Sequence, residues 1–155
     1  MKQGKSKRVS DRDAESLTAV EEVLSALNGA SENSPKSSFL IIVEGRRDIL
    51  SLRSLGIPEE IEIVKCANRP TAEFCEKIAE TEKEAVILTD WDRKGGILAS
   101  RLAEQFQNLN VTYHTEYRET LLFYTKKEIK DVESLFSYVG KLKNSDDEEE
   151  NEKFE

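Results

Sequence analysis

The sequence predicts an α/β domain whose four-stranded parallel sheet is flanked by helices, with an extra N-terminal helix before it and C-terminal helices after it. Two observations predict this. Short apolar runs rich in β-branched residues recur along the chain, and segments with helical periodicity alternate with them. Such alternation is typical of βαβ units, whose right-handed crossovers produce a parallel sheet. At 155 residues the chain is long enough to bury one apolar core.

Four segments are predicted to be strands. Residues 39–43 read Phe-Leu-Ile-Ile-Val, a continuous apolar run of the kind that is buried on both faces of a parallel sheet. The other three segments are 61–64, 85–89 and, with a weaker pattern, 111–113.

Six segments are predicted to be helices, because their apolar residues recur at three- and four-residue steps. They are 13–28, 48–55, 71–81, 96–109, 118–124 and 126–143. Gly29 is expected to end the first helix, and residues 30–38, rich in Ser, Asn and Pro, are predicted to be a linker. We expect the first helix to pack on the domain, and Thr125 with Glu128 to form a capping box for the last helix.

The chain divides into three parts by composition. Residues 1–37 are predicted to be a basic tail, an amphipathic helix and a linker, residues 38–143 the α/β domain, and residues 144–155 a disordered acidic tail. The formal charge of -8 argues against a nucleic-acid partner, but the last eleven residues hold seven acids and one lysine, whereas the first ten hold four bases and no acid. A bound metal can also recruit phosphate where the overall field is unfavourable.

Cysteine and histidine are too few for a zinc site. Cys66 and Cys75 do not form a C-x-x-C motif, and His114 is the only histidine, so we interpret both thiols as reduced and partly buried. No apolar run is long enough to cross a bilayer, and no apolar stretch follows the basic start as it would in a signal peptide. We therefore expect a cytoplasmic protein without a membrane partner.

Acidic side chains directly follow the first and third predicted strands. Glu44 comes after the first, and Asp90 and Asp92 come after the third. Ligands of open parallel sheets bind at the carboxyl ends of the strands, and a spacing of two at an extended strand end points both aspartates to one side. Glu44 joins them if the two strands are neighbours. Three hard oxygen ligands at one edge predict a Mg²⁺ site, for which Mn²⁺ would use the same ligands.

An alternative explanation exists for each acid taken singly. Carboxylates at strand ends often cap the following helix or are exposed to solvent. The two groups of acids together, in this order behind two buried strands, favour the metal site. Gly45 and Gly95 suit such a site, because glycine lets the backbone turn sharply or approach a phosphate closely.

Basic side chains near the predicted site are candidates for phosphate binding. They are Arg46 and Arg47 after the first strand, Arg69 after the second, and Arg93 and Lys94 after the third. For those after the first and third strands, a solvated helix surface is the competing interpretation. Trp91 lies between the two aspartates in sequence, so we expect it to point away from them into packing; stacking on a base is the alternative.

Two motifs at these strand ends resemble those of the Toprim domain. They are Val43-Glu44-Gly45-x-x-Asp48 after one strand and Thr89-Asp90-x-Asp92-x-x-Gly95 after another. The resemblance covers about residues 38–113. The whole chain is similar to the small stand-alone Toprim proteins of archaea, which are related to the ribonuclease that matures 5S rRNA and to the Toprim domains of DnaG-type primases.

The resemblance implies a Rossmann-like sheet, Mg²⁺ bound by Asp90 and Asp92, and Glu44 as general acid/base or as a further metal ligand. It also implies a supporting role for the acid at Asp48. We expect the chain to lack the nucleophilic-tyrosine domain of topoisomerases and the zinc module of primases. Its four tyrosines are accordingly interpreted as packing residues.

Three functions are compatible with these features. We favour metal-dependent hydrolysis of phosphodiester bonds in structured RNA, rather than DNA, with Glu44 positioning or deprotonating the attacking water. One alternative is a non-catalytic module that binds RNA or a ribonucleoprotein through the metal, with protein contacts made by the N-terminal helix or the acidic tail. The other is a primase-like nucleotidyl transfer. The presence of Glu44 favours an enzyme, because a module that only binds has no need of a general base.

Overall fold

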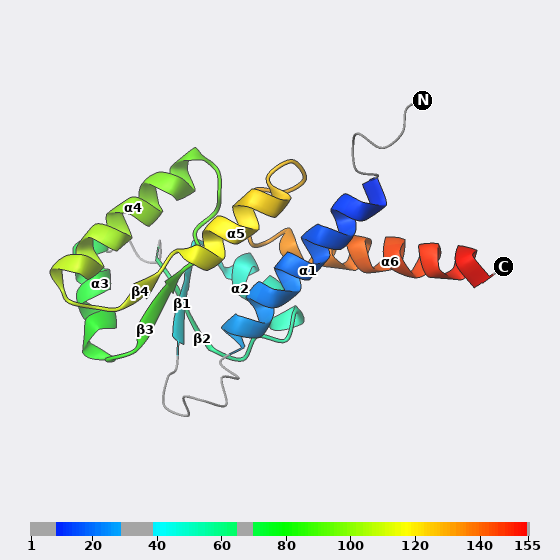
Figure 1. Cartoon of the computed structure of the whole chain (residues 1–155). Helices are drawn as coiled ribbons and strands as arrows, with labels where there is room; N and C mark the ends of the chain where they lie inside the picture. The colour runs from blue at the N-terminus through cyan, green and yellow to red at the C-terminus, as the bar shows by residue number, and fades with distance from the viewer. Residues whose placement is uncertain (1–8, 29–38, 65–69, 155) are drawn as a thin grey trace.

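A four-stranded parallel sheet lies at the centre of the protein, in the order β2-β1-β3-β4 (Figure 1). The computed structural model describes residues 9–28, 39–64 and 70–154. The strands are β1 (Phe39–Val43), β2 (Glu60–Ile63), β3 (Glu84–Ile87) and β4 (Tyr113–His114). All four predicted strands are therefore confirmed, and so is the predicted α/β fold class.

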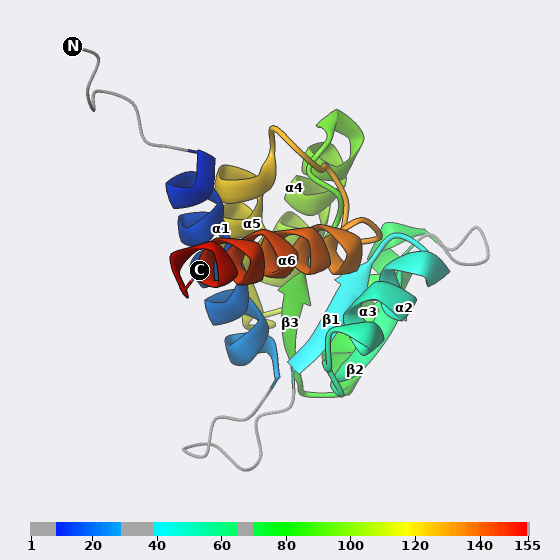
Figure 2. The ribbon, with the colours of Figure 1, turned by 90° about the vertical axis from the view of Figure 1, so that its right-hand side faces the viewer.

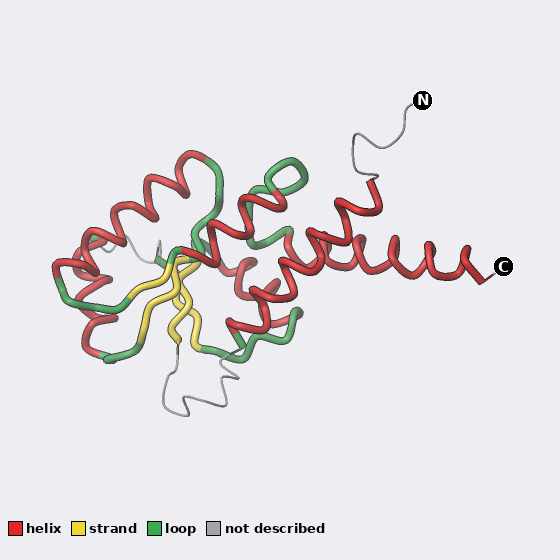
Figure 3. The backbone as a smooth tube through the Cα atoms, viewed as in Figure 1, coloured by secondary structure: helices red, strands yellow, loops and turns green. Residues whose placement is uncertain are grey.

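Helices lie on both sides of the strands, as the red and yellow segments of Figure 3 show. They are α1 (Val9–Leu27), α2 (Arg46–Ser54), α3 (Thr71–Glu80), α4 (Arg93–Asn108), α5 (Glu116–Thr125) and α6 (Leu135–Phe154). The extra N-terminal helix α1 packs on α5 and α6 and buries Val20, Val23 and Leu27. The expectation that α1 packs on its own domain is thus confirmed.

The sheet separates two apolar cores, because successive side chains of a strand point to opposite faces. On β1, Ile41 and Val43 join the core formed with α1, α2, α5 and α6. Leu40 and Ile42 join the other core, formed with α3 and α4. Figure 1 shows these two helical layers on either side of the sheet. Burial on both faces explains why the sequence of β1 is continuously apolar.

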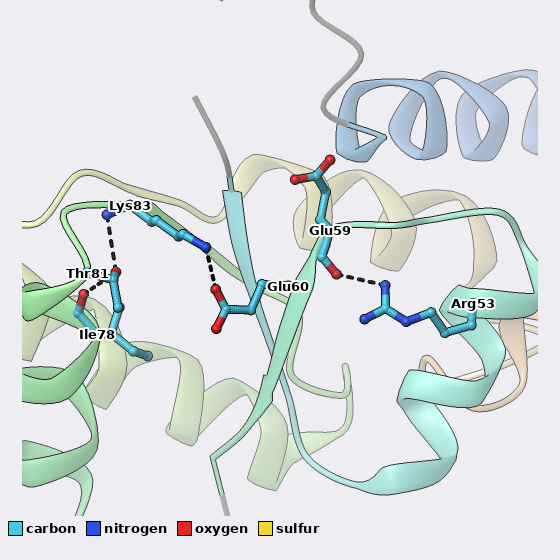
Figure 4. A network of polar contacts seen from close by, with 6 residues as sticks. All are labelled: Arg53, Glu59, Glu60, Ile78, Thr81 and Lys83. Carbon is cyan, nitrogen blue, oxygen red and sulfur yellow. Dashed lines mark hydrogen bonds and ion pairs between the residues drawn. The ribbon is translucent and has the colours of Figure 1, made fainter. Parts of the chain in front are cut away.

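A polar network lies at the amino-terminal ends of β2 and β3, away from the carboxyl ends (Figure 4). Glu60, at the start of β2, pairs with Lys83, which directly precedes β3. The Lys83 N–H also donates to Thr81 Oγ1 at 3.2 Å, and Arg53 Nη1 donates to the Glu59 carbonyl at 2.7 Å. These contacts join α2 and the segment before β3 to the start of β2.

The last helix begins later than the sequence predicts. A helix was expected over residues 126–143, but α6 starts at Leu135, and the predicted capping box of Thr125 and Glu128 is wrong. The Thr125 hydroxyl instead donates to the Leu121 carbonyl at 2.6 Å, inside the last turn of α5. Turns and irregular backbone fill the segment from 126 to 134.

The acidic C-terminal segment also differs from the expectation of a disordered tail over residues 144–155. Helix α6 continues through it to Phe154. Glutamate and lysine are good helix formers, and they extend a helix whose first half is already stabilised by packing. The predicted basic tail, Gly29 and the linker fall on residues 1–8 and 29–38, outside the described residues. No helix in the described ranges is both long and apolar enough to cross a membrane.

The single histidine lies between two carboxylates. His114 Nε2 is 2.8 Å from Glu84 Oε1, and Nδ1 is 2.7 Å from Glu116 Oε1. Burial lowers the pKa of His114, but the hydrogen bonds and negative charges of the two glutamates outweigh burial and raise it above the ordinary value of 6.5. The folded protein therefore holds this proton more tightly than the unfolded chain does.

This site predicts a stability loss at high pH. The stabilisation by protonated His114 is complete below the unfolded pKa and is lost as pH rises through the raised folded pKa. We expect the free energy of unfolding to fall by about 1 kcal/mol over this window, because the ion pairs are partly exposed. Denaturant titrations at several pH values measure the fall, and Glu116→Gln should reduce it. An NMR titration that places the pKa of His114 at or below 6.5 contradicts the prediction.

Candidate functional site

The carboxyl ends of β1 and β3 adjoin, because the two strands are direct neighbours in the sheet. Glu44 follows β1, and its Oε2 accepts a hydrogen bond from the Asp90 N–H at 2.8 Å. This bond joins residues 46 positions apart and places Glu44 against the loop that follows β3. The neighbouring strands on which the predicted site depends are therefore present.

The loop after β3 leads tightly into α4. Asp92 is the N-cap of α4, and its Oδ1 accepts from the Gly95 N–H at 2.7 Å. The Thr89 hydroxyl donates to the Gly95 carbonyl at 2.8 Å. A Cβ atom on Gly95 would lie 1.8 Å from the Asp90 carbonyl oxygen, so only glycine fits there. Helix capping by Asp92 matches the alternative explanation offered for such an acid.

The loop after β1 is closed by Asp48. Its Oδ2 accepts from the Gly45 N–H at 3.0 Å, and the residue is 5% exposed. Burial raises the pKa of Asp48, and backbone hydrogen bonds, first among them that from Gly45, oppose the rise. This geometry fits the supporting role that the sequence motif implies.

Arg118 is a buried cation at the site that sequence reasoning missed. Its Nε donates to the Thr89 carbonyl at 3.0 Å, and its Nη2 donates to the Asp90 carbonyl at 2.7 Å. The residue is only 8% exposed. Burial lowers the pKa of Arg118, while the negative charges of Glu44 and Asp92 oppose the fall, so the guanidinium stays charged. No sequence signal distinguishes it, because an arginine in a predicted helix is usually exposed.

The segment between α5 and α6, orange in Figure 2, is hydrogen-bonded to the loop that follows β3. The Trp91 N–H donates to the Lys130 carbonyl at 2.8 Å, and Trp91 Nε1 donates to the Ile129 carbonyl at 2.9 Å. Trp91 is 7% exposed and belongs to the core, which confirms the prediction that it packs inward. This connection brings Asp131 and Glu133, two acids that the sequence did not single out, to the site.

A pocket of about 350 Å³ opens at this edge. It is lined by Glu44, Gly45, Arg46, Arg47, Asp48, Asp90, Asp131 and Glu133. Asp92, Arg93 and Lys94 lie beside it at the exposed start of α4, and Arg69 lies outside the described residues. Arg47 Nη1 is 3.4 Å from Glu133 Oε1, and this ion pair is largely exposed.

Asp90 is the electrostatic centre of the pocket. Its Oδ1 is buried and has no hydrogen-bond partner in the part of the chain that the structure describes. Burial raises the pKa of Asp90 to about 7, and the negative charges of Glu44, Asp48, Asp131 and Asp92 add to the rise. A carboxylate surrounded by four others is stabilised by a cation, which replaces the proton.

The donors suit a hard cation that keeps most of its water. All candidate ligands are carboxylate oxygens, and no described residue donates a hydrogen bond to Asp90 Oδ1. As they are arranged, the described residues contain no group of three or more acids, histidines or cysteines ready to hold a metal ion. Mg²⁺ does not require such a cage, because it binds one or two carboxylates and retains several waters. To bind the cation through Oδ1, Asp92 would have to give up the hydrogen bond from the Gly95 N–H or share this oxygen between the two.

Comparisons with known proteins decide the family. Residues 41–133, more than half of the chain, match the family described as Toprim-like. The chain belongs to this Toprim-like family. Toprim-like domains typically bind a divalent metal ion and act on nucleic acid, so this Toprim-like protein carries the fold and the acidic strand ends of a metal-binding, nucleic-acid-acting domain.

Archaeal UPF0292 proteins match most of this Toprim-like chain, which is therefore also a UPF0292 protein. That of Methanosarcina acetivorans is 45% identical over 139 residues, covering 87% of this chain and 92% of the relative. That of Methanocaldococcus jannaschii is 37% identical over 121 residues, covering 77% and 89%. A solved structure of a putative protein from Aquifex aeolicus is also similar, with a TM-score of 0.55 and 20% sequence identity. The match covers 74% of this chain and 95% of the Aquifex chain, and at this identity it shows a similarity of fold alone.

The pKa of Asp90 predicts that Asp90→Asn stabilises this Toprim-like protein. The folded state keeps the proton up to pH about 7, whereas the unfolded chain releases it near 3.8, so stability falls as pH rises between these values. Above pH 7 we expect the variant to gain about 2 kcal/mol in free energy of unfolding and to lack this slope. Urea titrations measure both effects. Glu76→Gln, an exposed change on α3, is the control, and an unchanged slope in Asp90→Asn contradicts the prediction.

Proposed function

We propose that this protein is a Mg²⁺-dependent enzyme that hydrolyses phosphodiester bonds in nucleic acid, with structured RNA as its substrate. The observation that supports it is Asp90, whose buried Oδ1 has no hydrogen-bond partner among the described residues and whose pKa is raised by burial and by the charges of four other acids. Such a carboxylate is stabilised by a proton or a cation. Two arginines line the same pocket, where they can bind the phosphates of a substrate.

The cation would be held by Asp90 and Asp92, and Glu44 would serve as the base rather than as a ligand. When bound, Mg²⁺ would supply charge neutralisation at the scissile phosphate and a more acidic water. Asp48 would keep its structural bond to the Gly45 N–H and so hold the first turn of α2 in place.

Glu44 would act as the general base. The Asp90 N–H donates to its Oε2, and the carboxylate lines the pocket in which a phosphate would bind. Arg46 and Arg47 lie on the same wall and would orient the phosphate oxygens. Arg47 must first leave Glu133, which costs little because the ion pair is exposed.

The test is cleavage of a folded RNA that contains both helices and single-stranded loops, in Mg²⁺, Mn²⁺ or a chelator. We expect cleavage with either metal and none with the chelator. Glu44→Gln should slow cleavage by about 100-fold or more, because a positioned general base contributes about 10²–10⁴. Glu104→Gln, an exposed change on α4 outside the pocket, is the matched control.

Other outcomes would assign the protein differently. Equal RNA binding by the native protein and Glu44→Gln, without cleavage by either, would indicate a metal-dependent binding module. Primer synthesis from added nucleotides would indicate nucleotidyl transfer. A DNA of the same sequence, run in parallel, tests the preference for RNA.

A further inference from the structure

Two adjacent aromatic side chains at the end of α5 are exposed. Phe123 is 68% exposed and Tyr124 is 38% exposed. Their rings meet edge to face, with centroids 4.9 Å apart. Exposing a pair of large aromatic rings is unfavourable in water, so a surface of this kind often marks a binding site.

These rings line a second pocket, of about 380 Å³, between the start of α1, the end of α5 and α6. We call it the aromatic groove. The Ser16 hydroxyl donates to the Tyr124 carbonyl at 3.1 Å, and this bond joins α1 to α5 there. The volume is within the range of pockets that hold small ligands, and it suffices for one nucleobase and its sugar.

Three cations line the aromatic groove without partners. Arg12, Lys126 and Lys127 are exposed, and their side chains make no hydrogen bond or ion pair within the described part of the chain. Unpaired cations beside exposed aromatic rings are the two features that proteins use to bind single-stranded nucleic acid.

Three acids also line the aromatic groove, namely Asp13, Glu15 and Glu128. They equal the three cations in number, so the groove carries no excess of positive charge. The buried ring of Tyr138 belongs to α6, whereas Phe123 is the most exposed ring of the groove. Phosphates are therefore favoured beside Lys126 and Lys127 and disfavoured beside the three acids.

We propose that the aromatic groove binds a single-stranded segment of nucleic acid, with a base stacked on Phe123 and Tyr124 and phosphates on Lys126 and Lys127. A protein partner fits less well, because the centres of protein interfaces are depleted in lysine.

A short piece of backbone connects the aromatic groove to the pocket that contains Glu44 and Asp90, which we call the acidic pocket. Lys126 and Lys127 line the groove, the Ile129 and Lys130 carbonyls are held by Trp91, and Asp131 already lines the acidic pocket. The groove is a separate site, and binding in it does not require the metal chemistry proposed above.

The test is fluorescence anisotropy with labelled single strands of about ten nucleotides, a length typical of such sites. A chelator is present throughout, so a failure here is distinguishable from a failure of the proposed enzyme. RNA, DNA of the same sequence and the matched duplex are compared. We expect single strands to bind more tightly than the duplex, and Phe123→Ala to weaken their binding about tenfold, as for the loss of one stacked base. Phe136→Ala, 49% exposed on α6 outside the groove, should have no effect.

The salt dependence tests the lysines separately. Replacing Lys126 and Lys127 together by alanine should lower the slope of log affinity against log salt by about 1.4, because each phosphate contact on a single strand contributes about 0.7. Lys77→Ala, exposed on α3, is the matched control.

Two results overturn the proposal. One is that the native protein does not bind single strands. The other is that Phe123→Ala binds single strands as tightly as Phe136→Ala does. In that case the exposed rings would be assigned to contact with a protein partner. Thermal melting of each variant verifies that it is folded, and Phe123 is exposed enough that its removal leaves the core intact.

Discussion

Gly95→Ala should destabilise the protein by about 3 kcal/mol or more, the upper end of the range for overpacking. The new methyl group would lie 1.8 Å from the Asp90 carbonyl oxygen and 2.5 Å from its carbonyl carbon. Both atoms are backbone, so no side-chain rotation relieves the clash. The loop after β3 must move, and the move strains the Asp92 cap on the Gly95 N–H and the bond between Glu44 and the Asp90 N–H.

The neighbouring glycine provides a matched control. A Cβ atom on Gly96 would be 3.7 Å from Arg118 Nη2, an ordinary van der Waals contact. Because alanine is the better helix former and Gly96 lies in the first turns of α4, Gly96→Ala should be neutral or stabilising by up to about 1 kcal/mol. Urea titrations of both variants measure the difference.

Equal stability of the two alanine variants would contradict the close packing of α4 on the loop after β3. Loss of stability in Gly95→Ala should be accompanied by loss of any metal-dependent activity. Gly96→Ala should keep that activity, because Gly96 donates nothing to the acidic pocket.

Arg118→Met should cost about 3 kcal/mol in free energy of unfolding, since it breaks a buried charged network. The change removes the donors to the Thr89 and Asp90 carbonyls and leaves both acceptors without these bonds. It also removes the buried positive charge that faces Glu44 and Asp92. The loss should be larger above pH 7, where Asp90 is ionised, than below it.

Arg101→Met is the matched control for this second prediction. Arg101 is exposed on α4, and its replacement should change the free energy of unfolding by no more than about 0.5 kcal/mol. Arg118→Lys restores one charge but not the two separate donors, so it should recover part of the loss. If Arg118→Met is as stable as Arg101→Met, Arg118 does not hold the loop.

Local patterns predict the central strands and the acids that follow them. The continuous apolar sequence of β1 indicates burial on both faces, and the structure buries Leu40 and Ile42 in one core and Ile41 and Val43 in the other. Because parallel strands end at the same edge, the pattern predicts that Glu44 and Asp90 lie at one edge of the sheet, and the pairing of β1 with β3 brings them into contact.

The start of α6 shows where local patterns fail. Residues 126–143 have helical periodicity, yet the segment up to 134 is irregular. Its Ile129 and Lys130 carbonyls accept hydrogen bonds from Trp91, 38 and 39 positions away in sequence. Tertiary contacts of this kind override a weak helical preference, and they are invisible in a window of neighbouring residues.

The sequence by itself determined the parallel sheet and the edge at which Glu44 and Asp90 lie, because these depend on the burial of short apolar segments. The strand order that makes β1 and β3 neighbours, and so brings the two acids together, came from the tertiary structure. Only the tertiary structure decided that Arg118 holds the loop after β3 and that Asp131 and Glu133 complete the acidic pocket. It also decided that Asp92 caps α4. The physical reason is that these roles depend on contacts between backbone groups of distant segments. The periodicity of apolar residues along the chain does not predict such contacts.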